Sequence, residues 1–243
     1  MENVKIRLSV LLLAAVMMAA CDDGTIQEKG YASTDGKNVR LEGVIEGCDA
    51  WDDGYTVNIA GFSENDDYAT IAKVITPDAT NGNRVSVLLS GIPEAVTSVR
   101  LCVLNRLRQH VATFAEVDIT SASTRDTVRM DVGTVSAGPF AAIQAAYFNT
   151  TCVACHGATG RAAAGLFLTS DRSYDALVGV PSKKVEGQQL VVPGNAEASI
   201  LYQALTTELT STWREYHRDL VSEYFEINIL PVLRRWIDGG AER

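Results

Sequence analysis

Methionine and histidine are scarce in this chain of 243 residues, which contains four methionines and three histidines. No methionine follows Met130, so the C-terminal part of the chain offers no thioether as a metal ligand. The apolar run from Leu8 to Ala20 is shorter than the roughly 20 residues that a bilayer-spanning helix needs. The aspartates are scattered without the spacing of an EF-hand loop. These shortages exclude an EF-hand calcium site and argue against a spanning helix at the N-terminus.

Acidic residues outnumber basic ones, 30 to 21, and the formal net charge at pH 7 is −9. Such a balance should repel nucleic acid and anionic lipid surfaces. A charged protein partner would therefore present a basic surface, although a solvated acidic surface is also an ordinary property of proteins. The composition predicts no nucleic-acid partner.

The first 20 residues have the pattern of a secretory signal peptide, because Lys5 and Arg7 precede the apolar run and small residues follow it. Residues Met18-Ala19-Ala20-Cys21 resemble the lipobox of bacterial lipoproteins. This resemblance implies that Cys21 is lipidated and becomes the new N-terminus; the alternative is ordinary cleavage that leaves Cys21 as a spare thiol. We expect export from the cytoplasm and a lipid anchor in the inner or outer membrane of the cell envelope.

Alternation of apolar and polar residues predicts strands over residues 38–135, after a linker at 21–37. The clearest candidate strands are residues 39–45, 55–60, 85–89, 99–104, 111–117 and 127–132. About seven short strands, separated by Gly, Asn, Asp and Pro, predict a small antiparallel β-sandwich that is immunoglobulin-like. Trp51 lies only three residues after Cys48, which argues against a true immunoglobulin domain.

The five cysteines are distributed in a way that predicts three roles. Cys152 and Cys155 belong to the motif described next, and Cys21 belongs to the leader. One pair then remains, Cys48 and Cys102, in a chain that export would place in an oxidising compartment. We expect a disulfide between these two cysteines; the alternative is two buried thiols that pack as small apolar groups.

The motif Cys152-Val153-Ala154-Cys155-His156 is the attachment signal of c-type haem. Each thiol can add to one vinyl group of the porphyrin, and the adjacent imidazole can ligate the iron from one face. A thioredoxin-like redox pair would need a βαβ setting, which the surrounding pattern lacks. A structural zinc site would need a second close pair of Cys or His, and the sequence has none. We therefore expect one covalent haem c with its iron bound by His156.

Helical periodicity replaces the strand pattern after the Gly- and Pro-containing linker at residues 133–139. The apolar residues that recur on one face before the haem motif are Phe140, Ile143, Ala146 and Tyr147. A last helix is predicted to begin near Pro231 and to stop at Gly239. The sequence thus predicts a multi-domain α+β protein, with an all-α haem domain at residues 140–243 after the sandwich.

Several segments of residues 140–243 resemble the class I, single-haem cytochrome c domains of the cell envelope. The resembling segments are Phe148 to Gly157, Ala164 to Leu168, Val191 to Asn195, Ser199 to Tyr202 and Leu233 to Ala241. The resemblance covers less than half of the chain, and the haem motif is its specific part. It implies a cytochrome c-like fold in which the first and last helices cross over the haem edge.

The chain departs from that family in the second iron ligand, because the family usually brings a methionine from a loop shortly before the last helix. His217 is the only histidine after the haem motif and lies in the corresponding stretch. It is the first candidate for the distal ligand, which would give bis-histidine coordination. His110 or Met130 would have to reach the iron from the sandwich. A five-coordinate or water-ligated iron is the remaining alternative.

Three classes of function fit these patterns. A six-coordinate haem has no open position for a substrate, so the first is transfer of single electrons between partners in the envelope. The second is a haem protein with an open distal site, either peroxidase-like or gas-binding, which needs a free iron position and an acid or base beside it. The third is a docking module whose sandwich binds a partner and whose haem is secondary. The sequence favours an electron carrier over a catalyst, and no catalytic cluster occurs in residues 38–135.

Overall fold

The computed structural model describes residues 35–76, 83–157 and 162–243. The predicted signal peptide at residues 1–20, the lipidation of Cys21 and most of the linker at 21–37 lie outside the described residues. No helix within the described ranges is long and apolar enough to cross a membrane.

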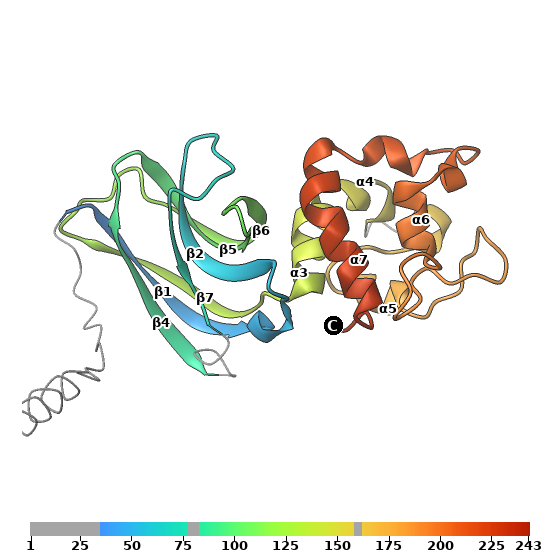
Figure 1. The fold of residues 1–243 in the computed structure, drawn as a ribbon, viewed down its shortest axis with the longest axis horizontal. Helices are drawn as coiled ribbons and strands as arrows, with labels where there is room; N and C mark the ends of the chain where they lie inside the picture. Colours follow the sequence, from blue (N-terminus) through green and yellow to red (C-terminus); the bar gives the residue numbers. More distant parts are fainter. Residues whose placement is uncertain (1–34, 77–82, 158–161) are drawn as a thin grey trace, which may run out of the picture. The chain divides into compact units, whose positions relative to one another are not determined.

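Seven strands form two sheets, as the spacing of the apolar segments predicted (Figure 1). The three-stranded sheet has the order β4-β1-β7, and its members are β1 (Lys37–Glu46), β4 (Arg84–Ile92) and β7 (Thr127–Ser136). The four-stranded sheet has the order β3-β2-β5-β6, and its members are β2 (Tyr55–Ser63), β3 (Ile71–Val74), β5 (Val96–Asn105) and β6 (His110–Asp118). A 3-10 turn, Cys48–Ala50, follows β1.

Strand β5 shows how the alternation of side chains separates two hydrophobic clusters. Leu101 and Val103 point into the interior of the sandwich and belong to its main core. Cys102 and Leu104, on the other face of the strand, pack in a small outer cluster with Ala60, Phe62 and Ala69. The four-stranded sheet is therefore apolar on both faces, and one of them lies outside the sandwich.

The prediction of a wholly antiparallel sandwich is wrong, because β1 pairs with β7 in parallel. The register of this pair shifts between Glu42 and Gly43, which leaves Val132 as an extra residue in β7. A Cβ atom on Gly43 would collide with the Val132 side chain, so glycine is required where the two backbones approach at this bulge. The other predicted strands are present, with bounds that differ by a few residues from those predicted. Strand β3 was not among the candidates because its four residues alternate weakly.

Residues 139–156 form one continuous helical stretch made of α3 (Pro139–Ile143), a π-helix (Gln144–Cys152) and α4 (Val153–His156). The wider turns of the π-helix change which side chains face inward. Gln144 and Phe148 are buried together with Phe140 and Tyr147. Phe148 lies eight residues after Phe140, within the face that a regular helical period also allows, although it was absent from the predicted stripe.

The remaining helices are short. They are a 3-10 turn at Ala163–Gly165, α5 (Ser173–Leu177), α6 (Ile200–Thr206), 3-10 turns at Glu208–Thr210 and His217–Leu220, a π-helix at Phe225–Ile229 and α7 (Leu230–Asp238). The last helical stretch thus begins before Pro231, and the π-helix that precedes α7 accommodates the missing proline N–H. It ends at Gly239 as predicted.

The predicted fold class is wrong, because residues 140–243 do not form an all-α cytochrome c-like domain and the described chain is mostly β. Isolated bridges join Val178 to Val191, Pro181 to Gln189 and Val192 to Asn195. Glycine and proline interrupt this region repeatedly and shorten its helices; these residues are Gly165, Gly179, Pro181, Gly187, Pro193 and Gly194. A predicted boundary near residue 138 coincides with the change from strand to helix and stays a prediction about domains.

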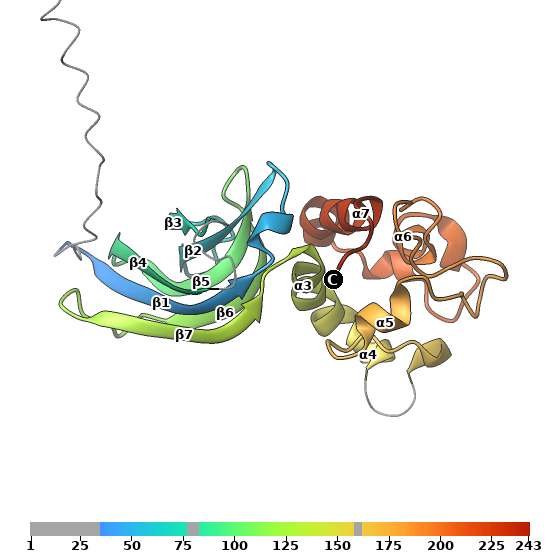
Figure 2. The same ribbon diagram turned by 90° about the horizontal axis from the view of Figure 1, so that it is seen from below.

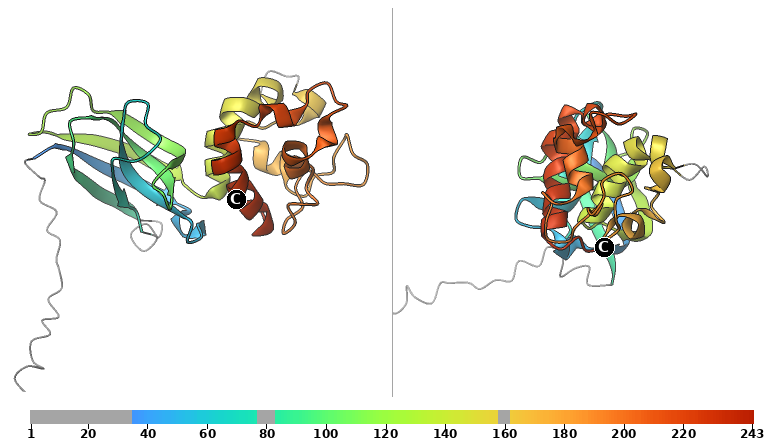
Figure 3. Two further views of the ribbon diagram at one scale, coloured as in Figure 1. Left: turned by 45° about the horizontal axis from the view of Figure 1, so that its top comes forward. Right: turned by 90° about the vertical axis from the view of Figure 1, so that its right-hand side faces the viewer.

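Helices α3 and α7 lie side by side (Figures 2 and 3). The rings of Phe140 and Trp236 join them, with centroids 5.0 Å apart. Tyr147 stacks on Phe225 at 3.7 Å, so the two π-helices also touch each other. The first and last helical stretches therefore pack together through aromatic side chains, next to the helix end that carries the Cys-His motif.

Polar contacts attach the helices to the sandwich within one compact unit. The Tyr224 hydroxyl lies 3.0 Å from the His110 Nδ1 atom and 3.0 Å from the His110 carbonyl oxygen. The Arg235 guanidinium binds both carboxylate oxygens of Asp52, at 2.7 and 2.8 Å. The stretch of chain that ends at Tyr224 is thus held by His110, the first residue of β6.

Candidate functional site

The Cys-His motif lies at the C-terminal end of the continuous helical stretch. Cys152 ends the π-helix, and Cys155 and His156 lie in α4. Cys152 is partly buried and Cys155 is exposed, and both are free thiols. Burial raises the pKa of the Cys152 thiol to about 12, with the charge of Cys155 as the second cause. Cys152 is therefore a protonated thiol at neutral pH.

The orientation of His156 is set by a backbone group. Its Nδ1 atom lies 3.1 Å from the carbonyl oxygen of Leu166. The His156 carbonyl in turn accepts a hydrogen bond from the Leu168 N–H, at 2.8 Å. When Nδ1–H donates to Leu166, the ring keeps the tautomer whose Nε2 carries the free lone pair. This is the arrangement that a metal-binding histidine needs.

The structure brings His217 next to His156, although 60 residues separate them in the sequence. The centroids of the two rings are 6.3 Å apart and their planes are inclined by 36°. His217 starts the 3-10 turn His217–Leu220, and the edge of Trp213 packs against it with a centroid distance of 5.9 Å. The residue expected to supply the distal ligand thus faces the residue expected to supply the proximal one.

His217 is held through its backbone and through its ring. Its N–H donates to the hydroxyl oxygen of Thr210, at 3.0 Å, and Thr210 is fully buried. The Nδ1 atom of His217 is buried and has no hydrogen-bond partner. Burial, and second the neighbouring His156, lower the pKa of His217, while a hydrogen bond with the Glu215 backbone and the charge of Glu215 act in the opposite direction. The ring is accordingly neutral, which is the form that binds a metal.

These residues fit a haem iron better than a metal ion bound by protein alone. Two imidazoles that bind one metal from opposite sides, with metal–nitrogen bonds of about 2.0 Å, have ring centres roughly 6 Å apart. The observed separation of 6.3 Å agrees with that value. In the described part of the chain, no group of three or more His, Cys, Asp or Glu side chains could hold a metal ion. A porphyrin supplies the other four ligands itself, so two axial histidines suffice.

The other candidate ligands lie elsewhere. The Nε2 atom of His110 lies 2.7 Å from the Thr113 hydroxyl and its Nδ1 atom lies 3.0 Å from Tyr224, so both ring nitrogens are engaged. Burial first, and Arg100 second, lower the pKa of His110 to about 4. Met130 is buried in the core of the sandwich. Neither residue is brought to His156.

The predicted Cys48–Cys102 disulfide is wrong, because Cys102 is a free thiol. The physical reason is the alternation along β5. Cys102 points to the outer face of the four-stranded sheet, whereas Cys48 packs in the main core. Burial raises the pKa of Cys102 to about 12, and it packs as a small apolar side chain.

Three contributors to the site were missed in the sequence. The Leu166 carbonyl, the Thr210 hydroxyl and the Trp213 ring surround the two histidines. Leu166 does lie in one of the segments that resemble cytochrome c, so that segment was a signal for its importance. Backbone carbonyls and threonines are too common for the other contacts to be read from residue types.

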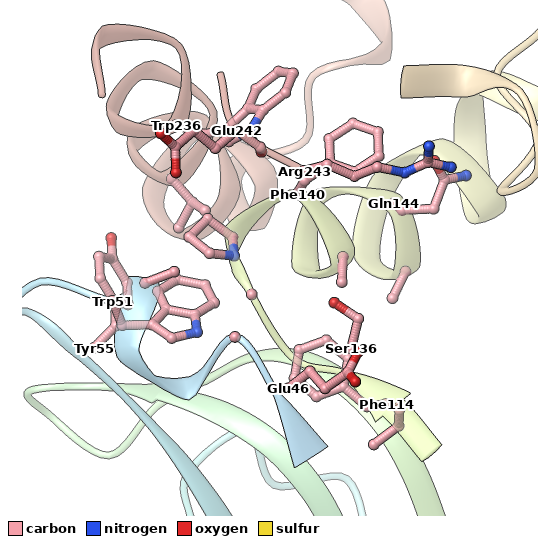
Figure 4. A pocket seen from close by; sticks show the side chains of 18 of the residues that line it. Glu46, Trp51, Tyr55, Phe114, Ser136, Phe140, Gln144, Trp236, Glu242 and Arg243 are labelled. Atoms are coloured by element: carbon pink, nitrogen blue, oxygen red, sulfur yellow. Dashed lines mark hydrogen bonds between the residues drawn. The ribbon is translucent and has the colours of Figure 1, made fainter. Parts of the chain in front are cut away.

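A pocket lies between one end of the sandwich and helices α3 and α7 (Figure 4). It has a volume of about 1070 Å³, and Trp51, Tyr55, Phe140 and Trp236 contribute rings to its wall. Its indole N–H groups are already used, since Trp51 donates to Ala137 O at 2.7 Å and Trp236 donates to Glu242 O at 2.6 Å. The buried polar side-chain atoms without a partner in the described residues all lie outside this wall. The cleft holds no residue of the Cys-His site.

Comparison with models of protein families, with curated proteins and with solved structures gave no match. The interpretation of the site therefore depends on its own residues and geometry.

Proposed function

We propose that this protein is a membrane-anchored c-type cytochrome that binds one covalent haem c and transfers single electrons in the cell envelope. The observation that carries the proposal is the placement of His217 opposite His156, with ring centroids 6.3 Å apart. It occurs beside a Cys-x-x-Cys-His motif, whose meaning as haem attachment is specific. The site thus offers two thiols and two axial imidazoles to one cofactor.

Each residue has a definite task in this proposal. Cys152 and Cys155 hold the cofactor through thioether bonds, and Leu166 orients the proximal His156 through its carbonyl. His217 supplies the second axial ligand. The haem supplies a one-electron couple when it is bound, and imidazole in place of a thioether gives a lower potential than His/Met ligation. Both axial positions are occupied by protein, which favours electron transfer over reaction with a substrate at the iron.

The net charge and the lipid anchor would serve recognition of a redox partner. With a net charge of −9, the protein suits a redox partner with a basic surface and repels nucleic acid. The lipid on Cys21 would keep the protein close to a membrane and raise the local concentration of a membrane-bound partner. The sandwich then acts as a spacer or docking unit between the anchor and the haem site.

The test is the visible spectrum of the protein purified from a host that matures c-type cytochromes. We expect covalent haem and low-spin spectra in both oxidation states. His217→Ala should turn the iron high-spin because one axial ligand is lost. His110→Gln is the matched control, since His110 is already bonded on both nitrogens, and it should keep the low-spin spectrum.

Three results would contradict the proposal. Absence of covalent haem would leave the docking-module function. A wild-type protein that is already high-spin would favour an enzyme with an open distal site. A low-spin spectrum that survives His217→Ala would assign the distal ligand to another residue.

A further inference from the structure

We infer that Gln144 is a positioning residue for the proximal iron ligand. It holds residues 166–168 against the helical stretch 139–156, so that the Leu166 carbonyl meets the His156 ring, and it thereby lowers the reduction potential of the iron. This inference deepens the proposed function and rests on it. Gln144 belongs neither to the Cys-His motif nor to the segments that resemble cytochrome c.

The side-chain amide of Gln144 is buried and hydrogen-bonded through both its nitrogen and its oxygen. The residue is 6 % exposed. Its Nε2 atom donates to the Leu168 carbonyl oxygen at 2.9 Å and to Asn149 Oδ1 at 2.7 Å. Its Oε1 atom accepts a hydrogen bond from the hydroxyl of Ser173, which is fully buried, at 2.5 Å. Because each atom of the amide has a matching partner, the amide keeps one orientation, with Nε2 toward Leu168.

The π-helix that begins at Gln144 makes this arrangement possible. Asn149 follows Gln144 by five residues, and on an α-helix it is residues three or four apart that are neighbours. In a π-helix the backbone hydrogen bonds join residues five apart, so these two side chains come together. The wider turn therefore gives the second N–H of the amide an acceptor on the same helix, and the first remains for Leu168.

Residues 166–168 are bonded to the helical stretch at three points. The Leu166 carbonyl oxygen lies 3.1 Å from His156 Nδ1, and the Leu168 N–H donates to the His156 carbonyl at 2.8 Å. The Leu168 carbonyl accepts from Gln144. Leu166 has an extended backbone conformation, and in an extended chain the groups of residues two apart point to the same side. The bond from Gln144 therefore helps to aim both carbonyls at the helix.

The turn that precedes Leu166 needs such support. Ala164 and Gly165 both lie in the left-handed region, with φ of 52° and 69°. This conformation is unfavourable for alanine and persists only when the surrounding structure holds it. Leu168 is 3 % exposed and packs in the main core, and Gln144 adds a directional bond at the same residue. Together they fix the end of the segment that carries the Leu166 carbonyl.

The hydrogen bond between His156 and Leu166 affects the iron through the imidazole. A ring whose Nδ1–H donates to a carbonyl is a more basic ligand than a ring without an acceptor. A more basic axial ligand stabilises the oxidised iron more than the reduced iron, so it lowers the potential. Loosening residues 166–168 should therefore raise the potential. A role of Gln144 in packing alone would change the stability of the protein and leave the potential as it is.

Two measurements on the full-length holoprotein test the inference. They are the midpoint potential and the rate at which the His156 Nδ1–H exchanges with solvent, followed by NMR in the reduced low-spin state. Gln144→Met keeps an unbranched side chain of similar length but removes the amide. We expect a higher potential and an exchange that is roughly 5- to 30-fold faster, because loss of a buried hydrogen bond favours local opening.

Asn58→Leu is the matched control. Asn58 carries a buried amide, with the residue 2 % exposed, and it bonds to Thr56 within the sandwich. Its replacement should lower the stability of the protein, as that of Gln144 does. It should leave the potential and the exchange of the His156 Nδ1–H at their wild-type values.

Ser173→Ala covers the case in which Gln144→Met yields no holoprotein. Alanine keeps most of the packing at this buried position but removes the hydroxyl that bonds to Gln144 Oε1. The amide then loses the partner that defines its orientation. We expect the same two changes as in Gln144→Met, with a smaller size, because the bond to Leu168 is weakened rather than removed.

The outcomes separate this inference from the proposed function. A wild-type protein without covalent haem, or with high-spin iron, defeats the proposed function before any variant is compared. A low-spin wild type whose potential and Nδ1–H exchange are unchanged in Gln144→Met, or in Ser173→Ala where only that variant is obtained, overturns the positioning role alone. An equal rise of the potential in Asn58→Leu also overturns it, since the effect would then follow stability.

Discussion

The helical stretch 139–156 and the segment 207–224 place one histidine each at the same site, but they do so by different means. The first is a continuous run of α and π turns, and His156 follows the two cysteines within it. The second contains two short 3-10 turns joined by turn and bend residues. His156 is hydrogen-bonded through its ring to a backbone carbonyl, and His217 through its backbone N–H to a side chain.

In the proposed haem site, this difference would give two ways of fixing an iron ligand. On the helix, residues close in sequence share one rigid backbone, so their relative positions follow from local structure. On the segment 207–224, the position of His217 depends on separate side-chain contacts with Thr206 and Thr210 and, through Tyr224, with His110 of the sandwich. We therefore expect changes on the helix to abolish cofactor binding and changes on the segment to alter ligation and stability.

The largest effect should come from the helix. Cys152→Ser combined with Cys155→Ser removes both thioether bonds, and we expect complete loss of covalent haem. Haem-linked peroxidase staining of denaturing gels and the mass of the intact protein measure this directly. His217→Ala, on the other segment, should keep the covalent haem. Covalent haem in the double variant, or its loss in His217→Ala, would contradict the division of roles between the two regions.

The contact between the helical stretch 139–156 and the π-helix that directly follows the segment 207–224 is the next target. Phe225 is buried and stacks on Tyr147 at 3.7 Å, so Phe225→Ala should lower the free energy of unfolding by about 3 to 5 kcal/mol. Ile227 lies in the same π-helix but is 56 % exposed, so Ile227→Ala should change it by less than about 0.5 kcal/mol. Denaturant unfolding of both variants measures the difference. Equal losses would show that the stack does not join the regions.

The third prediction concerns the tether at the end of the segment and its pH dependence. The pKa of His110 is about 4 in the folded protein and about 6.5 when unfolded. Above pH 6.5 the ring is neutral in both states and its contribution to stability is complete. Between pH 6.5 and 4 only the unfolded state gains the proton, so stability falls, by roughly 3 kcal/mol in total.

His110→Gln provides the comparison for that pH dependence. The difference in unfolding free energy between wild type and variant should shrink as the pH falls from 6.5 to 4, and it should be constant below that range. Urea unfolding at several pH values gives this difference directly. A difference that does not vary with pH would show that His110 is not held neutral by its contacts.

The smallest effect is expected from the exposed Arg218. Removing its bond to the Thr206 carbonyl with Arg218→Ala should lower global stability by at most about 1 kcal/mol. Hydrogen exchange should nevertheless become up to about fivefold faster in residues 211–221, because local opening needs less free energy. Amides of the helix at residues 144–152 should be unaffected. Acceleration in both regions alike would mean that they open together.

The strands were predictable because alternation along a half-buried strand is a local property. Six candidate strands are present, and β3 was missed because its four residues, partly or largely exposed, carry little pattern. The parallel pairing of β1 with β7 was not predictable, because these are the first and last strands along the chain and no local pattern links them. The alternation along β5 decides which face of the sheet carries Cys102. Whether Cys48 lies on the same face depends on how the two whole sheets pack.

The helical region was predicted less well. Apolar periodicity correctly placed a helix before the haem motif and another at the C-terminus. It did not show the π turns that bury Phe148 or the bridges at residues 178–195, which make the all-α prediction wrong. Such turns depend on packing between elements rather than on the preferences of single residues.

By itself, the sequence determined the Cys-x-x-Cys-His motif, its place at the end of a helix and the scarcity of methionine and histidine elsewhere. These are properties of neighbouring residues and of composition. Only the tertiary structure decided that the ring centroids of His217 and His156 lie 6.3 Å apart and that the Leu166 carbonyl orients the His156 ring. The reason is physical: contacts between residues far apart in the chain follow from how whole elements pack, which no local pattern encodes.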